Sequence, residues 1–230
     1  MTLAENLAEV RERIAKAARR AGRDESSVTL VAVSKTFGLD VIESALAAGV
    51  TDLGENRAQE FKQKVAVMGN RARWHFVGHL QTNKVRSVVG ANFLIHSVDR
   101  FGLAEAIARR ASTLGEVQDA LIEVNIARDP NKHGVDPARA ISLATEVHEL
   151  EGISVRGLMG MAPFVEEATE TRPYFAELAE LGVALGDRLG VEVHLSMGMT
   201  RDYEVAIEEG ATIVRVGEAI FGPRNPGRTG

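Results

Sequence analysis

Hydrophobic residues along the chain follow two alternating patterns, one typical of helices and one typical of buried strands. Over 2–22, apolar residues recur three or four positions apart, which predicts an amphipathic helix. Thr2 and Glu5 have the spacing of a capping box, and Gly22 suits the end of the helix. The next run, VTLVAV at 28–33, is almost continuously apolar, which indicates a strand buried on both faces.

The same alternation continues to the end of the chain. Each strand-like run is followed by a helical stretch. The predicted strands are 28–33, 51–54, 73–77, 92–98, 118–126, 154–161, 191–196 and 211–216. The predicted helices are 40–48, 57–68, 82–89, 100–114, 136–149, 168–189 and 201–208, with a short last helix from 217 or 218.

This order of elements predicts the fold class. Strict alternation of strands and helices favours a parallel sheet with right-handed crossovers. Eight such repeats in 230 residues match a (β/α)8 TIM barrel. The rival is a doubly wound open sheet, although no Gly-x-Gly-x-x-Gly motif follows the first strand. We predict an α/β chain with a single barrel domain over 28–222, an extra N-terminal helix over 2–22 and a turn-rich tail over 223–230.

Composition and charge exclude several classes of function. The chain has 27 basic and 32 acidic residues, and a net charge of −5 argues against a general nucleic-acid-binding protein. With no cysteine, it has no disulfide, no thiolate nucleophile and no cysteine metal ligand. No apolar run approaches the length of a membrane span, and acidic residues throughout the N-terminal helix are unlike a secretory signal. We expect a cytoplasmic protein that binds neither membranes nor nucleic acid.

Polar residues collect at the C-terminal ends of the predicted strands, where TIM barrels carry their functional groups. Lys35 ends the first strand. Desolvation or a nearby cation there would lower the pKa of its amine, so that it could attack an aldehyde and form a Schiff base. An ordinary solvated lysine is the simpler alternative for this position.

The last two strands end in sequences suited to an anion. Ser196 and Gly198 follow the seventh strand, and Gly217 follows the eighth. Glycines in these loops let backbone N–H groups approach a phosphate, although they could equally serve only as turns. Arg215, on the eighth strand, would bring a permanent charge to the barrel mouth or form a buried ion pair.

Together, the lysine, the phosphate cradle and the arginine describe a site for pyridoxal 5'-phosphate (PLP). This cofactor needs a lysine for its aldehyde, donors for its phosphate and a partner at its ring nitrogen. An arginine does not readily accept the ring proton, so the ring nitrogen would stay unprotonated beside Arg215. The ring would then be a weaker electron sink.

Several motifs resemble the pyridoxal phosphate homeostasis proteins, which are single-domain relatives of the N-terminal barrel of alanine racemase. The resemblance extends over about 28–222. The motifs are VAVSKT at 31–36, GENR at 54–57, WHFVGHLQTNK at 74–84, RGLMGM at 156–161, LSMGM at 195–199 and VRVG at 214–217. The sequence TRD at 200–202 departs from the Ser-Asp or Ser-Lys expected after this methionine, which puts the contacts of Arg201 in question.

The resemblance implies a set of cofactor-binding residues. They are Lys35 for the Schiff base, Asn56 close to the cofactor, Ser196, Gly198 and Gly217 for the phosphate, and Arg215 for the ring nitrogen. His79 and Met159 also lie in family motifs, without an assigned contact.

The resemblance also bears on activity. The resemblance implies that alanine racemase takes its second base, a tyrosine, from a separate C-terminal β domain, and we expect that domain to be missing here. Tyr174 and Tyr203 are the only tyrosines here, and both fall in predicted helices. We therefore expect no catalytic residues and a non-enzymatic, monomeric PLP carrier in vitamin B6 homeostasis, with apo PLP-dependent enzymes as candidate acceptors. The alternatives are a PLP-dependent amino-acid racemase or lyase of weak activity, and a barrel enzyme acting on a phosphorylated metabolite.

Two further signals are weaker. His75 and His79 share one face of a predicted strand, but no third ligand is evident, so no metal site is predicted. The segment 129–134 resembles a mobile polar loop over the barrel mouth, or it is only a turn. Lys132 in this segment is a candidate phosphate contact.

Overall fold

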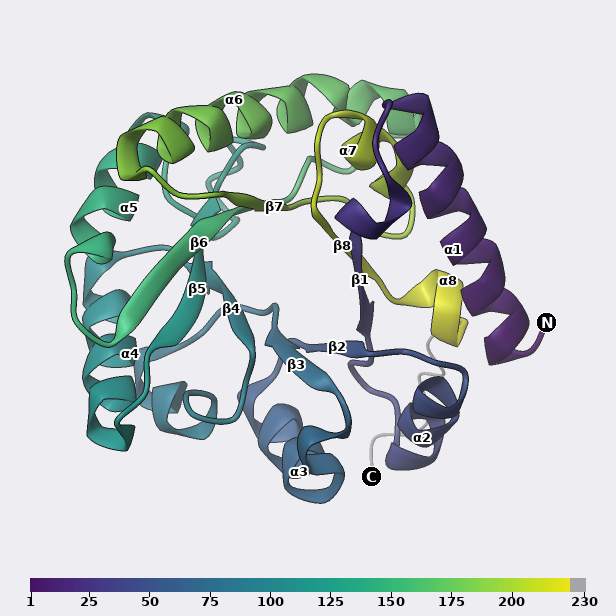
Figure 1. Ribbon diagram of the computed structural model, residues 1–230, viewed down its shortest axis with the longest axis horizontal. Coiled ribbons are helices and arrows are strands. Elements are labelled where there is room, and N and C mark those ends of the chain that lie inside the picture. Colours follow the sequence, from purple (N-terminus) through teal and green to yellow (C-terminus); the bar gives the residue numbers. More distant parts are fainter. Residues whose placement is uncertain (224–230) are drawn as a thin grey trace.

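The computed structural model describes residues 1–223 and shows a closed barrel of eight parallel strands surrounded by helices (Figure 1). The strands are β1 (Thr29–Val33), β2 (Asp52–Glu55), β3 (Arg73–Phe76), β4 (Leu94–Val98), β5 (Gln118–Val124), β6 (Ile153–Gly160), β7 (His194–Ser196) and β8 (Ile213–Val216). Because β1 pairs with both β2 and β8, the predicted TIM barrel is confirmed and the open-sheet alternative is wrong.

Helices follow the strands as expected. The α-helices are α1 (Leu3–Arg20), α2 (Leu39–Ala47), α3 (Ala58–Met68), α4 (Phe101–Leu114), α5 (Ala140–His148), α6 (Arg172–Leu189), α7 (Tyr203–Glu208) and α8 (Glu218–Phe221). The short 3₁₀ segments are η1 (Glu25–Ser27), η2 (Gly69–Arg71), η3 (Thr82–Ser87), η4 (Pro137–Arg139) and η5 (Ala168–Thr171).

The extra N-terminal helix α1 lies outside the barrel along α7 and α8 (Figure 1). Its capping box forms as predicted: the Thr2 hydroxyl accepts from the Glu5 N–H, and the Glu5 carboxylate accepts from the Thr2 N–H. The apolar face of the helix is buried. Arg20 in its last turn pairs with Glu204 and Glu208 of α7, and these ion pairs join α1 to the barrel.

The observed elements differ from the predicted ones at two 3₁₀ segments and at the ends of two strands. The predicted helix at 82–89 is the 3₁₀ segment η3, and the predicted helix at 136–149 begins with the 3₁₀ turn η4. The predicted strand at 191–196 shortens to β7, since Val191 remains 38% exposed and does not join the core. The predicted strand at 118–126 ends earlier, at Val124, where the chain turns into a loop.

Two apolar layers hold the barrel together. The larger one packs the helices onto the outside of the strands, and a small separate cluster fills the inside of the barrel. The inner cluster consists of Val31, Leu94, Leu121, Met159 and Ile213. Because strand residues two apart share a face, the next inward positions toward the mouth are Glu123 on β5 and Arg215 on β8, whereas on β1 the apolar Val33 comes before Lys35.

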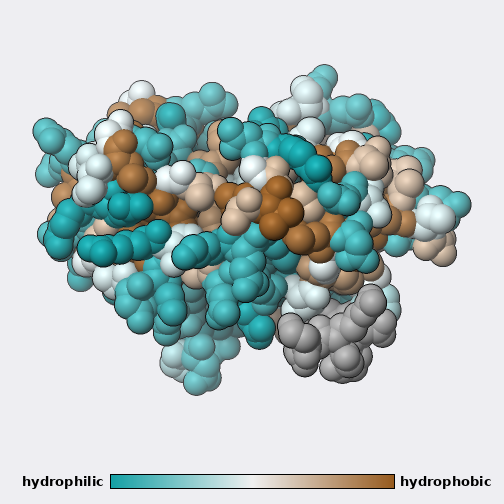
Figure 2. Space-filling view, turned by 90° about the horizontal axis from the view of Figure 1, so that it is seen from below, coloured by the Kyte–Doolittle hydropathy of each residue, from teal (hydrophilic) through white to brown (hydrophobic). Residues whose placement is uncertain are grey.

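The outer surface is mostly hydrophilic on the face shown in Figure 2, with hydrophobic residues between the polar ones. Among the described residues, no helix combines the length and the hydrophobicity that crossing a membrane would require. The predicted division into a barrel at 28–222 and a tail at 223–230 stays a prediction, and residues 224–230 of that tail lie outside the described residues.

Candidate functional site

Lys35 lies half-buried just beyond the C-terminal end of β1. It continues the inward-facing series of Val31 and Val33, so its side chain starts from the inner face of the barrel. The next residue, Thr36, has a positive φ of 70°, and its N–H donates to Glu60 Oε2 at 2.9 Å. A tight turn that is fixed by α3 therefore presents the lysine at the mouth.

A buried ion pair supports this turn from below. Lys64 Nζ of α3 donates to Glu55 Oε1 at 2.5 Å and to the Ser34 carbonyl at 2.8 Å. The Ser34 hydroxyl also donates to Glu55 Oε1, at 2.7 Å. Burial raises the pKa of Glu55, while Lys64 and Ser34 act in the opposite direction. The pair fixes the backbone immediately before Lys35, and it was not among the predicted site residues.

Asn56 follows β2 and faces the same end of the barrel. Its Oδ1 is buried and finds no hydrogen-bond partner among the described residues. Gly78, after β3, packs so closely on it that an added Cβ would lie 2.1 Å from the Asn56 carbonyl oxygen. A buried polar atom without a partner costs free energy, so Asn56 has the character of a ligand-binding residue.

Arg215 and Ser196 meet inside the barrel. Arg215 is 5% exposed, and its Nη1 donates to Ser196 Oγ at 2.6 Å. Its Nη2 donates to the Gly160 carbonyl at 3.2 Å. Burial lowers the pKa of Arg215 to about 10, against the opposite influence of Glu123 and Asp202, so the guanidinium stays charged at neutral pH.

A chain of hydrogen bonds continues from Ser196 across the barrel interior. Ser196 Oγ lies 2.8 Å from His96 Nδ1, and His96 Nε2 lies 3.0 Å from His75 Nδ1. His75 Nε2 lies 3.0 Å from Asp52 Oδ1 at the opposite end of the barrel. The Asp52 carboxylate also receives two hydrogen bonds from Arg73, at 2.8 and 2.7 Å.

The protonation states give this chain one direction. Burial alone would raise the pKa of Asp52, but hydrogen bonds from His75, Arg73 and Thr51 outweigh it and hold the pKa below its usual range. Burial lowers the pKa of both His75 and His96, so both rings are neutral. Since Asp52 can only accept, every proton points toward it, from Arg215 through Ser196, His96 and His75. The Ser196 hydroxyl proton therefore goes to His96.

Glu123 lies near the C-terminal end of β5 and is 3% exposed. Burial, followed by the charge of Asp99, raises the pKa of Glu123 to about 7, while Arg215 acts in the opposite direction. This acid titrates near neutral pH at the barrel mouth, and the sequence did not single it out.

Replacing Glu123 with glutamine should remove a pH-dependent loss of stability. The folded-state pKa of Glu123, about 7, lies above its ordinary value of 4.5. The free energy of unfolding therefore falls as the pH rises between these two values. Glutamine imitates the protonated acid, so the variant should match the parent near pH 5 and exceed its free energy of unfolding by about 3 kcal/mol at pH 8. Urea unfolding of the cofactor-free protein at both pH values measures this, with exposed Glu116→Gln as the control. An equal difference at both pH values would contradict the assignment.

The predicted phosphate loops lie at the ends of β7 and β8. Gly198 has a φ of 88°, and an added Cβ would lie 2.6 Å from Ala206 Cβ, so only glycine fits this turn against α7. Gly217 is the N-cap residue directly before α8, next to Val33 of β1. Arg201 belongs to the TRD sequence that departs from the family motif. Its guanidinium lies over the Phe164 ring, with Cζ 4.9 Å from the ring centroid.

The remaining candidates separate in space. His75 belongs to the interior chain, whereas His79 lies at the rim beside His133, so the two do not act together. Lys132 Nζ donates to the Ala162 carbonyl at 3.3 Å. Met159 lies inside the barrel and is 1% exposed.

Neither tyrosine serves the barrel mouth. Tyr203 of α7 is 1% exposed and lies beneath Arg13 of α1, on the outside of the barrel. Burial raises its pKa to about 12. Tyr174 packs on the outer apolar layer from α6.

Comparisons with known proteins agree with this geometry. Residues 6–225 match the family described as alanine racemase, N-terminal domain. A pyridoxal phosphate homeostasis protein from Aquifex aeolicus is 46% identical over 226 residues, covering 97% of this chain and 99% of the relative.

Two solved structures are similar along the whole barrel. A protein of unknown function from Bifidobacterium adolescentis has a TM-score of 0.89 and 38% identity, covering 95% of this chain and 94% of its own. PipY from Synechococcus elongatus, solved with PLP bound, has a TM-score of 0.84 and 36% identity, covering 96% of this chain and 100% of its own.

Proposed function

Because this chain belongs to the alanine racemase N-terminal domain family, and within it to the pyridoxal phosphate homeostasis proteins, we propose that it binds PLP and serves in PLP (vitamin B6) homeostasis. Lys35 holds the cofactor as a Schiff base. The chain then acts as a carrier with an incomplete catalytic site.

The observation that carries this proposal is the order of groups around one side of the mouth. β1 and β8 are neighbours, with Val31 opposite Arg215 in the register. Lys35 lies four positions further along the same face of β1, so the amine and the guanidinium enter the mouth from adjacent strands. The turns at Gly198 and Gly217 close the same arc from β7 and β8.

The residues present fit the chemistry of PLP. When bound, the cofactor supplies an aldehyde that the Lys35 amine takes up as a Schiff base, with loss of water. The turns at Gly198 and Gly217 receive the phosphate. Asn56, whose buried Oδ1 has no partner among the described residues, contacts the cofactor directly.

Arg215 limits the chemistry of the site through the ring nitrogen of PLP. Its guanidinium remains charged at neutral pH and is fixed by Ser196 and the Gly160 carbonyl. A charged arginine has no lone pair to offer, so it can only donate to a ring nitrogen and leaves that nitrogen unprotonated. Ser196 contributes by holding this arginine, and a direct phosphate contact of its own stays a prediction.

The proposed role is storage and delivery. Bound PLP is kept from reacting with other amines until an acceptor, such as an apo PLP-dependent enzyme, receives it. The proposed setting is the cytoplasm and the proposed state is a monomer. A weak amino-acid racemase or lyase activity is the alternative, against which stands the position of Tyr203 and Tyr174 away from the mouth.

The purified protein should show a visible absorption band that borohydride abolishes. Reduction converts the C=N bond into a stable amine, so peptide mapping should then find the added mass on Lys35. A protein without such a band after incubation with PLP would contradict the proposal. Exchange of amino-acid α-hydrogens with deuterated solvent, above the rate of free PLP, would favour the enzyme alternative.

A further inference from the structure

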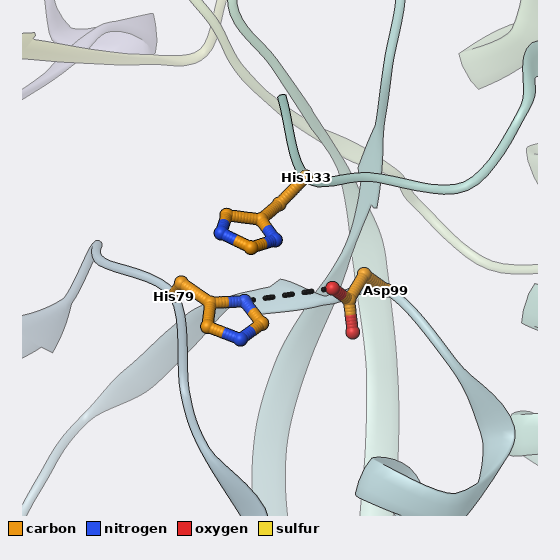
Figure 3. Close-up of side chains that lie close together, drawn as sticks. All are labelled: His79, Asp99 and His133. Carbon is orange, nitrogen blue, oxygen red and sulfur yellow. Dashed lines mark ion pairs between the residues drawn. The ribbon is translucent and has the colours of Figure 1, made fainter. Parts of the chain in front are cut away.

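Three polar side chains meet at the rim of the barrel, across from the β7–β8 turns (Figures 1 and 3). His79 follows β3, Asp99 follows β4, and His133 comes from the loop after β5. Each offers one ligand atom, and all three atoms lie within 4.8 Å of one another. Figure 3 shows the two imidazole rings one above the other, beside the same carboxylate.

We propose that His79, Asp99 and His133 form a binding site for a divalent transition metal ion, with Zn²⁺ as its best-fitting occupant. Two imidazoles and one carboxylate are the donor set that suits zinc and its neighbours, and they leave further coordination positions for water. The site lies outside the proposed cofactor contacts.

The distances suit this ion. Zinc binds nitrogen and oxygen at about 2.0–2.2 Å, so two ligands of a tetrahedral site lie about 3.3 Å apart. His79 Nδ1 and Asp99 Oδ2 are already 3.5 Å apart. The rings of His79 and His133 are stacked with centroids 3.6 Å apart and 11° between their planes, so the exposed His133 ring has to turn out of the stack before its in-plane lone pair points to the same ion.

Asp99 is prepared for this role by its neighbour. Its Oδ1 accepts from Arg100 Nη1 at 2.6 Å, which leaves Oδ2 on the side of His79. Arg100 in turn donates to the Thr82 hydroxyl at 3.2 Å. Metal-binding carboxylates are commonly oriented by such a second partner.

The loop that carries His133 is fixed at both ends. Asn125 Nδ2 donates to the Asp129 carbonyl at 2.8 Å at its start. At its end, Gly134 has a φ of 112°, and an added Cβ would lie 2.6 Å from the Asn125 N. Lys132 Nζ is tied to the Ala162 carbonyl. These contacts hold His133 over His79 before any ion arrives, and an ion would join the loop to the ends of β3 and β4.

Calorimetric titration of the full-length protein with Zn²⁺ tests the proposal, with Mg²⁺ as a hard-cation control. We expect one equivalent of Zn²⁺ to bind and Mg²⁺ not to compete, since magnesium prefers oxygen ligands. His133→Ala should weaken Zn²⁺ binding by about 100-fold or more, because losing even an outer partner of a metal ligand costs about 10–100-fold. His148→Ala, at the exposed end of α5, should leave it unchanged.

Hydrogen exchange supplies a second readout. Zn²⁺ should slow amide exchange over 125–135 in the parent and in His148→Ala, but not in His133→Ala. Absence of Zn²⁺ binding, or equal losses in the two alanine variants, would overturn the site and show adventitious binding to surface histidines. Because the titration does not depend on PLP, its failure is separate from a failure of the proposed function.

Discussion

Replacing Lys35 with alanine should abolish covalent retention of PLP. The variant has no amine at the end of β1 to form the C=N bond, so borohydride should no longer fix any added mass in the protein. Phosphate and ring contacts remain, so PLP should still bind, but reversibly, and gel filtration should remove it. Absorption spectra before and after reduction, followed by peptide mapping, measure the change.

Lys62→Ala is the matched control, since Lys62 lies exposed on α3 in the same part of the molecule. It should keep the full band and the modified peptide. A Lys35→Ala protein that retains the same band, or that carries the reduced mass on Lys64, would contradict the assignment. Circular dichroism of both variants should show a folded barrel, because neither replacement removes an apolar core residue.

Replacing Lys64 with methionine should destabilise the protein by about 3–5 kcal/mol, the usual result of removing one partner of a buried ion pair. Glu55 is 0% exposed, and Lys64 Nζ donates to its Oε1 at 2.5 Å. The loss should be measured by urea unfolding of the cofactor-free protein. It should be larger at pH 8 than at pH 5.

The pH dependence follows from the sign of the pKa change. Without Lys64, burial raises the folded-state pKa of Glu55 further above its unfolded value. The variant can then escape the buried charge by binding a proton at low pH but not at high pH. The double variant Glu55→Gln/Lys64→Met should recover most of the stability. A loss that does not change with pH, or a double variant as unstable as the single one, would show that packing alone is at stake.

The barrel itself could be predicted because its signals are local. Each strand is a short apolar run, each helix has its own periodicity, and the capping box joins Thr2 and Glu5, which are only three positions apart. Boundaries shifted where 3₁₀ turns replace α-helix, as in η3 and η4, and where a residue such as Val191 remains exposed although its type favours a strand.

The candidate site could be predicted only where a strand end shows it. Lys35 and Arg215 stand at the ends of apolar runs, so their positions follow from the fold class. The chain from Ser196 to His96 joins residues 100 positions apart, and only the closed barrel brings them together. The same holds for His79 and His133, which come from loops after different strands.

One missed residue had a visible signal. Lys64 occupies the position on α3 that Phe61 and Met68 define as the buried face of that helix. A charged residue on an apolar helical stripe indicates a buried partner, since an unpaired buried charge is costly. The partner, Glu55, lies in the GENR motif, but no spacing in the sequence connects the two.

The one-way hydrogen-bond chain inside the barrel has an electrical consequence. Its hydrogens all point toward Asp52, and its cationic end, Arg215, lies at the mouth. The charged ends of this chain, Arg215 toward the mouth and Asp52 at the opposite end of the barrel, direct a positive pole toward an incoming ligand, whereas the bond dipoles of the hydroxyl and the two imidazoles between them point the other way. Because the charge of Arg215 is buried, dissolved salt screens it far less than it screens surface cations. A negatively charged phosphate ester thus meets a favourable electric field at the mouth, although the protein as a whole is also negative, with a net charge of −5.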